Sequence, residues 1–557
     1  MQAPMPRAGP IMVVEANRDQ GKEAQLSNLQ AGKTIADFVR TTLGPKACLK
    51  MLLDPMGGIV LTNDGNAILR EIDVTHPAAK SVIELSRALD EETGDGTTSV
   101  VILAGEMLAA SEQFLTKRII HPTVMVKGYM LALDFCLSKL ESIALHLDLN
   151  DRTRLVEVVN SCLNTKFCAR WGSKVAELAL EAAETVQEMD GSIRNIDIKR
   201  NARVIKIPGG EWEESRVLKG IMINKDVVHA KMRRSVRNPR ICLLDCTLEY
   251  KKGESMTNIE ISNDDDFAAI LDQEEKEIKK MCESIINSGA TVCFTEKGVS
   301  DLAQHFLLKA GISVVRRIKK TDNNRLARVC GATIVNRLEE LKPADVGSRA
   351  GLFEIRKIGD EYYAFVEDCA DPKACTIILR GASKDSLNEI ERNLNDAMFA
   401  ARNILLEGKL LPGGGATEME LACRVNDHAA KVEGLAQWPF KAVATALEAI
   451  PRTLAQNCGA EVVRKMTSLR AKHADAGQGC NIGFDGQTGD IVDVVENGIW
   501  DTYTVKVQVL KTAIEAACMI VRIDDVLSGV KPPSNKTDEP QVTNYEAPQQ
   551  FGDSRDG

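Results

Sequence analysis

Apolar residues recur with the period of a helix toward both ends of the chain, and form shorter strand-like runs in its middle. The first helical pattern covers 22–43, and Gly44-Pro45 stops it because proline cannot continue a helix. The same pattern predicts helices at 78–91, 97–115, 123–145, 151–162, 173–188, 383–406, 416–431, 438–457, 460–473 and 504–528. Outside its middle, the chain is therefore predicted to be mostly helical.

Three segments have the alternation and turn residues of β-hairpins. GGIVLTNDGNAIL (57–69) predicts strands at 59–62 and 67–69 around an Asn-Asp-Gly turn. GDEYYAFVEDC predicts a hairpin around Gly359-Asp360, and CNIGFDGQTGDIVDVVENG (480–498) predicts another.

The middle of the chain alternates short apolar strands with helices, as parallel α/β domains do. The strands are RICLLDCTLEY, ATVCFTEKG, ISVVRRI and ATIVNRL, and the helices between them are DLAQHFLLKAG and NNRLARVCG. A charged stretch at 252–286 interrupts this alternation, and its second half predicts a long amphipathic helix that projects from the domain or simply presents a solvated face.

This layout predicts one helical domain built from both ends of the chain, with the α/β domain inserted into it. The helical domain would comprise 14–147 and 412–529, and the inserted domain 213–375. Segments 148–212 and 376–411 would bridge the two and act as hinges. The Pro-rich start, 1–13, is expected to be a flexible arm, and the polar end, 530–557, a disordered tail.

Composition narrows the class of protein. The 557 residues suffice for about three or four domains, and 44% hydrophobic against 4% aromatic residues favours cores of Ala, Val, Ile and Leu. A net charge of −9 argues against nucleic-acid binding, and no apolar run is long enough for a membrane span or a secretory signal, so a soluble intracellular protein is expected.

Cysteine and histidine spacing argues against a zinc or histidine metal site. The 15 cysteines include no CxxC pair, and the seven histidines form no HxxxH pattern. Free buried thiols are expected, although a hairpin could bring Cys369 and Cys375 together.

Four glycine-rich corners remain as candidate sites: TTLGPK, TNDG, GDGTTS and LPGGGATE. Neither a Walker A loop, a dinucleotide-binding fingerprint nor a set of kinase motifs is present. Taken alone, each of these glycine-rich segments is typical of a helix end, a turn or a linker. GDGTTS, at 94–99, admits two interpretations: a capped turn, or an anion site in which helix N–H groups face a phosphate and Asp95 holds a metal ion.

Taken together, RTTLGPKACLK (40–50), LTNDGNAIL (61–69), GDGTTS and LPGGGATEME (411–420) resemble the signature segments of group II chaperonins. The closing segment, 498–526, also resembles theirs, and the similarity extends from about 14 to 530. Further segments, such as IPGGEWEES, TLEYKKGES and TDNNRLARVCGA, look like one subunit type of the eukaryotic cytosolic chaperonin, TRiC/CCT.

The resemblance implies a multidomain fold of α and α/β parts. A mostly helical equatorial domain, a hinge-like intermediate domain and an inserted apical α/β domain would correspond to the segments above, with 252–286 as a helical protrusion that helps form a lid. It also implies a double ring in which seven other paralogous subunits are partners, and clients that are unfolded cytosolic proteins of the actin and tubulin type. Neither a nucleic acid nor a membrane is expected as a partner, and the location implied is cytoplasmic.

The resemblance further implies an ATP/ADP site with Mg²⁺, whose residues are carried over one by one. Asp95 would bind Mg²⁺, Asp64 would lie beside the γ-phosphate, and Asp396 would orient or deprotonate the attacking water. Lys166 would reach the γ-phosphate as a point charge, and Thr165 would also contact the nucleotide. The other implied contacts are Gly96, Thr97, Thr98 and Ser99 to the β- and γ-phosphates, Gly44 and Pro45 near the α-phosphate, Gly414 and Gly415 at the nucleoside, Gly483 at the base and Asp501 at the ribose. Ala47 and Asp501 depart from residues common in relatives, which leaves the ribose contact the least secure.

The activity implied is ATP hydrolysis coupled to lid closure and protein folding. Two alternatives remain at this point. A small-molecule kinase would need a polar constellation for its second substrate, and the sequence offers none. A structural ring subunit with little turnover of its own is disfavoured because the carboxylates and lysine tied to hydrolysis are all present.

Overall fold

The structure is a computed structural model that describes residues 17–53, 57–117, 120–191, 193–250, 264–474 and 481–528. The expected arm at 1–13, the expected tail at 530–557 and the first part of the charged stretch, through 263, lie outside the described residues.

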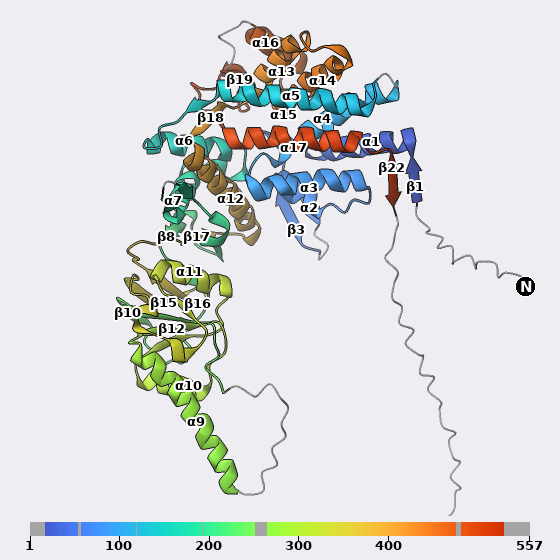
Figure 1. Cartoon of the computed structure of the whole chain (residues 1–557). Coiled ribbons are helices and arrows are strands. Elements are labelled where there is room, and N and C mark those ends of the chain that lie inside the picture. Colours follow the sequence, from blue (N-terminus) through green and yellow to red (C-terminus); the bar gives the residue numbers. More distant parts are fainter. Residues whose placement is uncertain are drawn as a thin grey trace, which may run out of the picture.

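A helical body unites the two ends of the chain (Figure 1). Its helices are α1 (Gly21–Arg40), α3 (Pro77–Glu92), α4 (Thr97–Thr116), α5 (Pro122–Ile143), α13 (Ala416–Ala429), α14 (Gln437–Leu447), α15 (Ala449–Asn457), α16 (Val462–Ala474) and α17 (Tyr503–Val521). One core cluster joins buried side chains from both halves, from Leu29 to Leu140 and from Leu411 to Val521. Helix α4 is buried on nearly every side, as expected of a helix with apolar residues all round.

The hairpin predicted over 57–69 is wrong. Strand β3 (Ile59–Thr62) pairs antiparallel with β2 (Lys50–Leu53), which lies before it, and 67–69 belong to helix α2 (Gly65–Glu71). Asp64 caps this helix by accepting hydrogen bonds from the N–H groups of Asn66 and Ala67, so the Asn-Asp-Gly sequence begins a helix rather than a turn.

Two of the predicted helices differ from the structure. The segment predicted as one helix, 438–457, is divided into α14 and α15, because Pro451 lacks an N–H and its ring conflicts with the carbonyl of Leu447. The last helix, α17, ends at Val521, and β22 (Asp525–Ser528) then pairs antiparallel with β1 (Asn17–Gln20). The two ends of the described chain are thereby joined in one small sheet.

The α/β middle is confirmed. Four parallel strands lie in the order β13 (Ser313–Val315), β12 (Val292–Thr295), β11 (Ile241–Leu244) and β14 (Ile334–Val335), with α10 (Asp301–Lys309) and α11 (Lys320–Cys330) connecting them. A second, antiparallel sheet contains the predicted hairpin β15 (Leu352–Ile358) and β16 (Glu361–Glu367). Helix α9 (Asp264–Asn287) packs on this core through Ile278, Cys282 and Ile285, while its first turns project from it (Figure 1).

A third core cluster lies between these two parts. It is formed by α6 (Arg152–Leu163), α7 (Gly172–Val186), α12 (Lys384–Glu407) and a sheet of β7 (Ala202–Pro208), β17 (Cys375–Gly381) and β8 (Arg216–Leu218). Parallel pairing of β7 with β17 joins the two chain segments that enter and leave the α/β part. The exact bounds of the three domains stay predictions. Cys369 and Cys375 are both free thiols.

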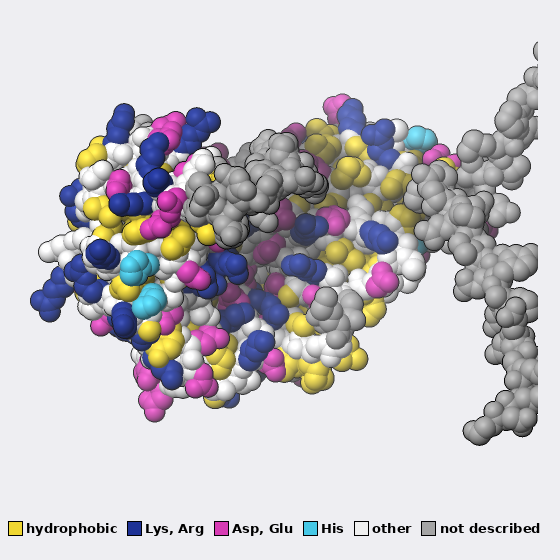
Figure 2. Space-filling view, turned by 90° about the horizontal axis from the view of Figure 1, so that it is seen from below, with side chains coloured by type: hydrophobic (Ala, Val, Ile, Leu, Met, Phe, Trp, Pro, Cys, Tyr) yellow, Lys and Arg dark blue, Asp and Glu magenta, His cyan; other side chains and the backbone are white. Residues whose placement is uncertain are grey.

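None of the described helices has the length and apolarity needed to cross a membrane. On the face shown in Figure 2, lysine and arginine side chains are interspersed with acidic ones rather than gathered in one basic field.

Candidate functional site

The GDGTTS segment comprises the end of the loop between α3 and α4 and the first turn of α4. Gly94 and Gly96 both have positive φ, 68° and 78°, and Gly96 is the N-cap of α4. A Cβ on Gly96 would lie 2.8 Å from Cγ1 of Val505 and 2.9 Å from Cγ2 of Val509, so only glycine fits there. Since Gly96 has no side chain, no side-chain hydrogen bond caps α4, and its first N–H groups remain available to an anion.

Two adjoining cavities meet at this loop. The first, of about 140 Å³, is polar at the helix end, and the second, of about 400 Å³, continues from it. Both are lined by Leu43, Gly44, Ser99, Ser161, Thr165, Asp501 and Lys506. The pair of cavities has the form expected for an elongated ligand with an anionic end at the loop.

Most of the predicted site residues line these cavities. In the first are Gly44, Asp95, Gly96, Thr97, Thr98, Ser99, Thr165, Lys166 and Asp501, and in the second Pro45, Gly414 and Gly415. Gly483 does not line either one. It packs behind the glycine turn, where an added Cβ would lie 3.1 Å from the Gly413 carbonyl oxygen, and Phe484 to Gln487 line the cavity in its place.

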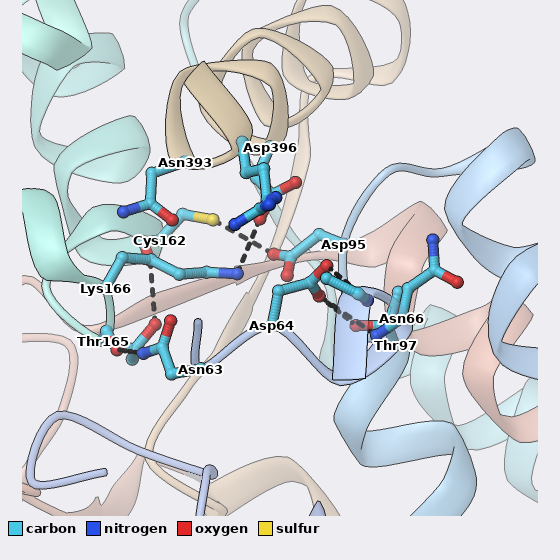
Figure 3. Close-up of polar contacts among 12 residues, drawn as sticks. Asn63, Asp64, Asn66, Asp95, Thr97, Cys162, Thr165, Lys166, Asn393 and Asp396 are labelled. Carbon is cyan, nitrogen blue, oxygen red and sulfur yellow. Dashed lines mark hydrogen bonds and ion pairs between the residues drawn. The ribbon is translucent and has the colours of Figure 1, made fainter. Parts of the chain in front are cut away.

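Asp64 and Asp396 lie at the edge of the first cavity and line a neighbouring one. The Thr97 hydroxyl donates to Asp64 at 3.0 Å, which ties the capping carboxylate of α2 to the first residue of α4. Asp396 lies on α12, and its Oδ2 atom is 2.6 Å from Nζ of Lys166, which follows α6 (Figure 3). An isolated aspartate on a helix is usually exposed, whereas Asp396 is only 8% exposed.

The carboxylates of Asp64, Asp95 and Asp396 surround the single ammonium of Lys166. Burial alone would lower the pKa of Lys166, but Asp396, Asp64 and Asp95 together raise it well above its ordinary value. Burial raises the pKa of Asp396 well above its ordinary range; Lys166 opposes this rise, while Asp64 and Asp95 add to it. Lys166 therefore stays protonated, and Asp396 has a higher proton affinity than an ordinary aspartate.

The carboxylate of Asp95 is held on both oxygens. Its Oδ1 accepts the N–H of Gly96 at 2.7 Å, and its Oδ2 lies 3.1 Å from Sγ of Cys162. Among the described residues, no group of three or more Asp, Glu, His or Cys side chains could hold a metal ion without other ligands. A single carboxylate beside an anion site fits Mg²⁺, which usually binds through one or two carboxylates together with phosphates and water.

One buried oxygen in the wall of the first cavity, Oδ1 of Asn63, has no hydrogen-bond partner within the part of the chain that the structure describes. An unpaired buried polar atom costs free energy, so its presence fits a site completed by a polar ligand.

The sequence analysis missed Lys506 and Glu418. Nζ of Lys506 donates to Glu418 and lies 3.0 Å from Oδ2 of Asp501. Burial raises the pKa of Asp501, which Lys506 opposes. The available signal was a lysine within the apolar run VKVQVL on the predicted closing helix, because a lysine buried on such a helix needs an acidic partner.

We expect Asp64→Asn to keep the cap of helix α2, which Asp64→Ala removes. Asparagine caps helices about as well as aspartate, so the unfolding midpoint should change little, whereas Asp64→Ala should cost about 1 kcal/mol of stability. Thermal unfolding of the full chain measures this difference. Equal midpoints for the two variants would contradict the capping role.

The chain matches the TCP-1/cpn60 chaperonin family over residues 35–531. It is 59% identical to T-complex protein 1 subunit gamma of Oxytricha granulifera over 555 residues, which cover 98% of this chain and 99% of that protein. The protein of the same name from Schizosaccharomyces pombe is 56% identical over 521 residues, 94% of this chain and 98% of that one. The one from Mus musculus is 56% identical over 525 residues, 94% of this chain and 96% of that one. The subunit type that IPGGEWEES, TLEYKKGES and TDNNRLARVCGA resembled is thus the gamma subunit.

Proposed function

Because the chain belongs to the TCP-1/cpn60 chaperonin family, we propose that it is a chaperonin subunit that hydrolyses ATP and couples this reaction to protein folding. The observation that carries the proposal is the Lys166–Asp396 pair, placed beside the uncapped start of α4 at the end of a polar cavity. An anion site, a carboxylate that would bind a metal ion and a buried carboxylate that would act as a base would thereby be within reach of one ligand.

The residues present fit ATP with Mg²⁺. The N–H groups of Thr97, Thr98 and Ser99 would bind phosphate oxygens at the positive end of the α4 dipole, and Asp95 would supply the protein ligand to the metal. Gly414 and Gly415, with Asp501, would receive the nucleoside in the second cavity. When bound, Mg²⁺ would neutralise charge on the phosphates.

The chain's own residues would then perform the proton transfer. Asp396 would orient a water molecule and accept its proton, a task that its raised pKa suits. Lys166 would hold the Asp396 carboxylate in place and contribute the positive charge at this end of the cavity. Asp64, fixed by its own helix and by Thr97, would complete the polar wall around the water.

Asp396 and Lys166 come from the part of the chain between the helical body and the α/β part, whereas Asp95 belongs to the body. A hinge motion of that middle part would complete or dismantle the site, and so link hydrolysis to movement of the α/β part and its projecting helix α9. Within this proposal, seven paralogous subunits complete each ring, unfolded proteins of the actin and tubulin type are the clients, and the cytoplasm is the location.

We expect Asp95→Asn to weaken MgATP binding by at least about tenfold, because a charged ligand to the metal is lost. Binding of a fluorescent ATP analogue to the full chain, with Mg²⁺ or with EDTA, measures this. The variant should show equal affinities in the two conditions. Asp134→Asn, an exposed carboxylate on α5, is the matched control and should retain the Mg²⁺ dependence. Unchanged binding by Asp95→Asn would overturn the assigned metal site.

A further inference from the structure

The end of helix α3 receives three hydrogen bonds from the middle part of the chain. Nζ of Lys199 donates to the carbonyl oxygen of Glu91 at 2.9 Å, and the guanidinium of Arg402 donates to that of Glu92 at 2.6 Å. Nδ2 of Asn403 donates to the carbonyl oxygen of Thr93 at 3.0 Å.

These three hydrogen-bond donors are of the kind that stabilises the C-terminal end of a helix. The last carbonyls of a helix lack partners within the helix, and cations are favoured at its negative end. Three successive carbonyls are satisfied here by side chains remote in sequence, two of them cationic. The residues that follow, from Gly94 onward, are the phosphate loop itself.

Phe399 makes a fourth contact with the same loop. A Cβ on Gly94 would collide with the Phe399 side chain, so the ring lies directly against the first glycine of the loop. Nζ of Lys199 lies 5.6 Å from the ring centroid, and Cζ of Arg402 lies 5.1 Å from it. The two cations that bind α3 thus also hold the ring, through cation–π interactions.

One helix carries both these contacts and the proposed base. Asp396, Phe399 and Asn403 are spaced by three and four positions on α12, so they lie on one face of it. A displacement of the loop at Gly94 therefore acts on the face of α12 that presents Asp396.

We propose that Phe399, Arg402 and Asn403 are positioning residues for ATP hydrolysis, which lock α12 onto the end of α3 and place Asp396 against the phosphate loop. The inference rests on the proposed function and deepens it. It assigns no contact with the nucleotide to these three side chains, since none of them lines the two nucleotide cavities.

The test uses the full chain reconstituted into the chaperonin, with hydrolysis by the other subunits silenced by substitution of their own catalytic aspartates. The variants are Arg402→Ala, Asn403→Ala and the conservative Arg402→Lys. Lys384→Ala, an exposed cation on the first turn of α12, is the matched control. Turnover, ATP affinity and hydrogen exchange of peptides spanning 86–100 are measured, and these peptides report on this subunit alone.

Loss of a charged hydrogen bond corresponds to about a tenfold change. Arg402→Ala should therefore lower kcat about tenfold and speed amide exchange at the end of α3 and in the loop by about the same factor. ATP affinity should change less than twofold, and Arg402→Lys should recover most of the loss, because lysine can still donate to the carbonyl of Glu92. A mutation that merely loosened the fold would weaken ATP binding as well, and lysine would not rescue it.

Two outcomes overturn the inference in different ways. If Arg402→Ala and Asn403→Ala match Lys384→Ala in turnover and exchange while Asp396→Asn abolishes turnover, the positioning role is wrong and the proposed ATPase stands. If Asp396→Asn also leaves turnover unchanged, the proposed function itself fails, and the positioning role fails with it.

Discussion

Asp396→Asn is expected to lower ATP turnover by this subunit at least about a hundredfold, while nucleotide affinity stays within about twofold. General bases contribute roughly a hundred- to ten-thousandfold to the reactions they serve, and asparagine cannot accept the proton of water. Affinity should persist because Asp396 lies behind Lys166, outside the lining of the two nucleotide cavities.

Turnover is measured on rings in which the other subunits are silenced, so that the remaining hydrolysis belongs to this chain. Asp385→Asn, on the first turn of the same helix, makes the same chemical change at an exposed position and should leave the rate unchanged. A parallel protease-protection assay reports closure of the α/β part. Unchanged turnover in Asp396→Asn would favour the alternative of a structural subunit with a passive site.

Lys166→Met is expected to lower the free energy of unfolding by about 3–5 kcal/mol at neutral pH. Removing one partner of a buried ion pair leaves an uncompensated charge in a low-dielectric site. Here Asp396 would lose its cation while Asp64 and Asp95 still repel it, and the side chains of Lys166 and Asp396 are each only 12% exposed.

The loss should depend on pH in a defined direction. Because the folded chain already raises the pKa of Asp396, and Lys166 is the group that opposes this rise, the variant raises that pKa further. The folded state of the variant binds a proton more tightly than the unfolded state, so its stability increases as pH falls through the raised pKa. Denaturant unfolding between pH 8 and about pH 5 measures the recovery.

The double variant Lys166→Met with Asp396→Asn is the control for this prediction. It removes both charges, and such replacements of a buried pair are often nearly neutral, so most of the lost stability should return without any dependence on pH. Catalysis should stay absent in both variants. A double variant as unstable as Lys166→Met alone would show that packing, not charge, causes the loss.

Periodicity predicted the helices of the body because their apolar residues face one shared core. It gave no warning that Pro451 divides one predicted helix, since the apolar spacing continues across the break. It also misassigned Asn63-Asp64-Gly65, because asparagine, aspartate and glycine favour both hairpin turns and helix starts. What decides between them is the pairing of Ile59–Thr62 with the strand before it, a contact that local sequence does not encode.

The candidate site was predictable only in part for a similar reason. Asp95 and its neighbours form one continuous segment, but its two glycines and three hydroxyls suit a capped turn as well as an anion site, and only the family resemblance favoured the anion site. The burial of Asp396 depends on contacts with segments more than 200 positions away, as its bond to Lys166 shows. Lys506 and Glu418 escaped notice because their contact joins positions 88 apart in the sequence, which local patterns do not encode. Gly483 packs behind the glycine turn rather than lining the cavity, which depends on tertiary packing in the same way.

The helical body has a consequence for synthesis on the ribosome. Its core needs Leu411 to Val521 as well as the first helices, and about 270 residues separate Ile143 from Leu411. The ribosome adds roughly 5–20 residues per second, so about 15 to 50 s pass between the synthesis of α5 and the emergence of the first residues that complete its core. Throughout that interval the apolar faces destined for the shared core are exposed, while the inserted α/β part can already complete its own. We therefore expect a newly made copy of this chain to be prone to aggregation until its second half emerges, and translation pauses between 143 and 411 to lengthen that exposure.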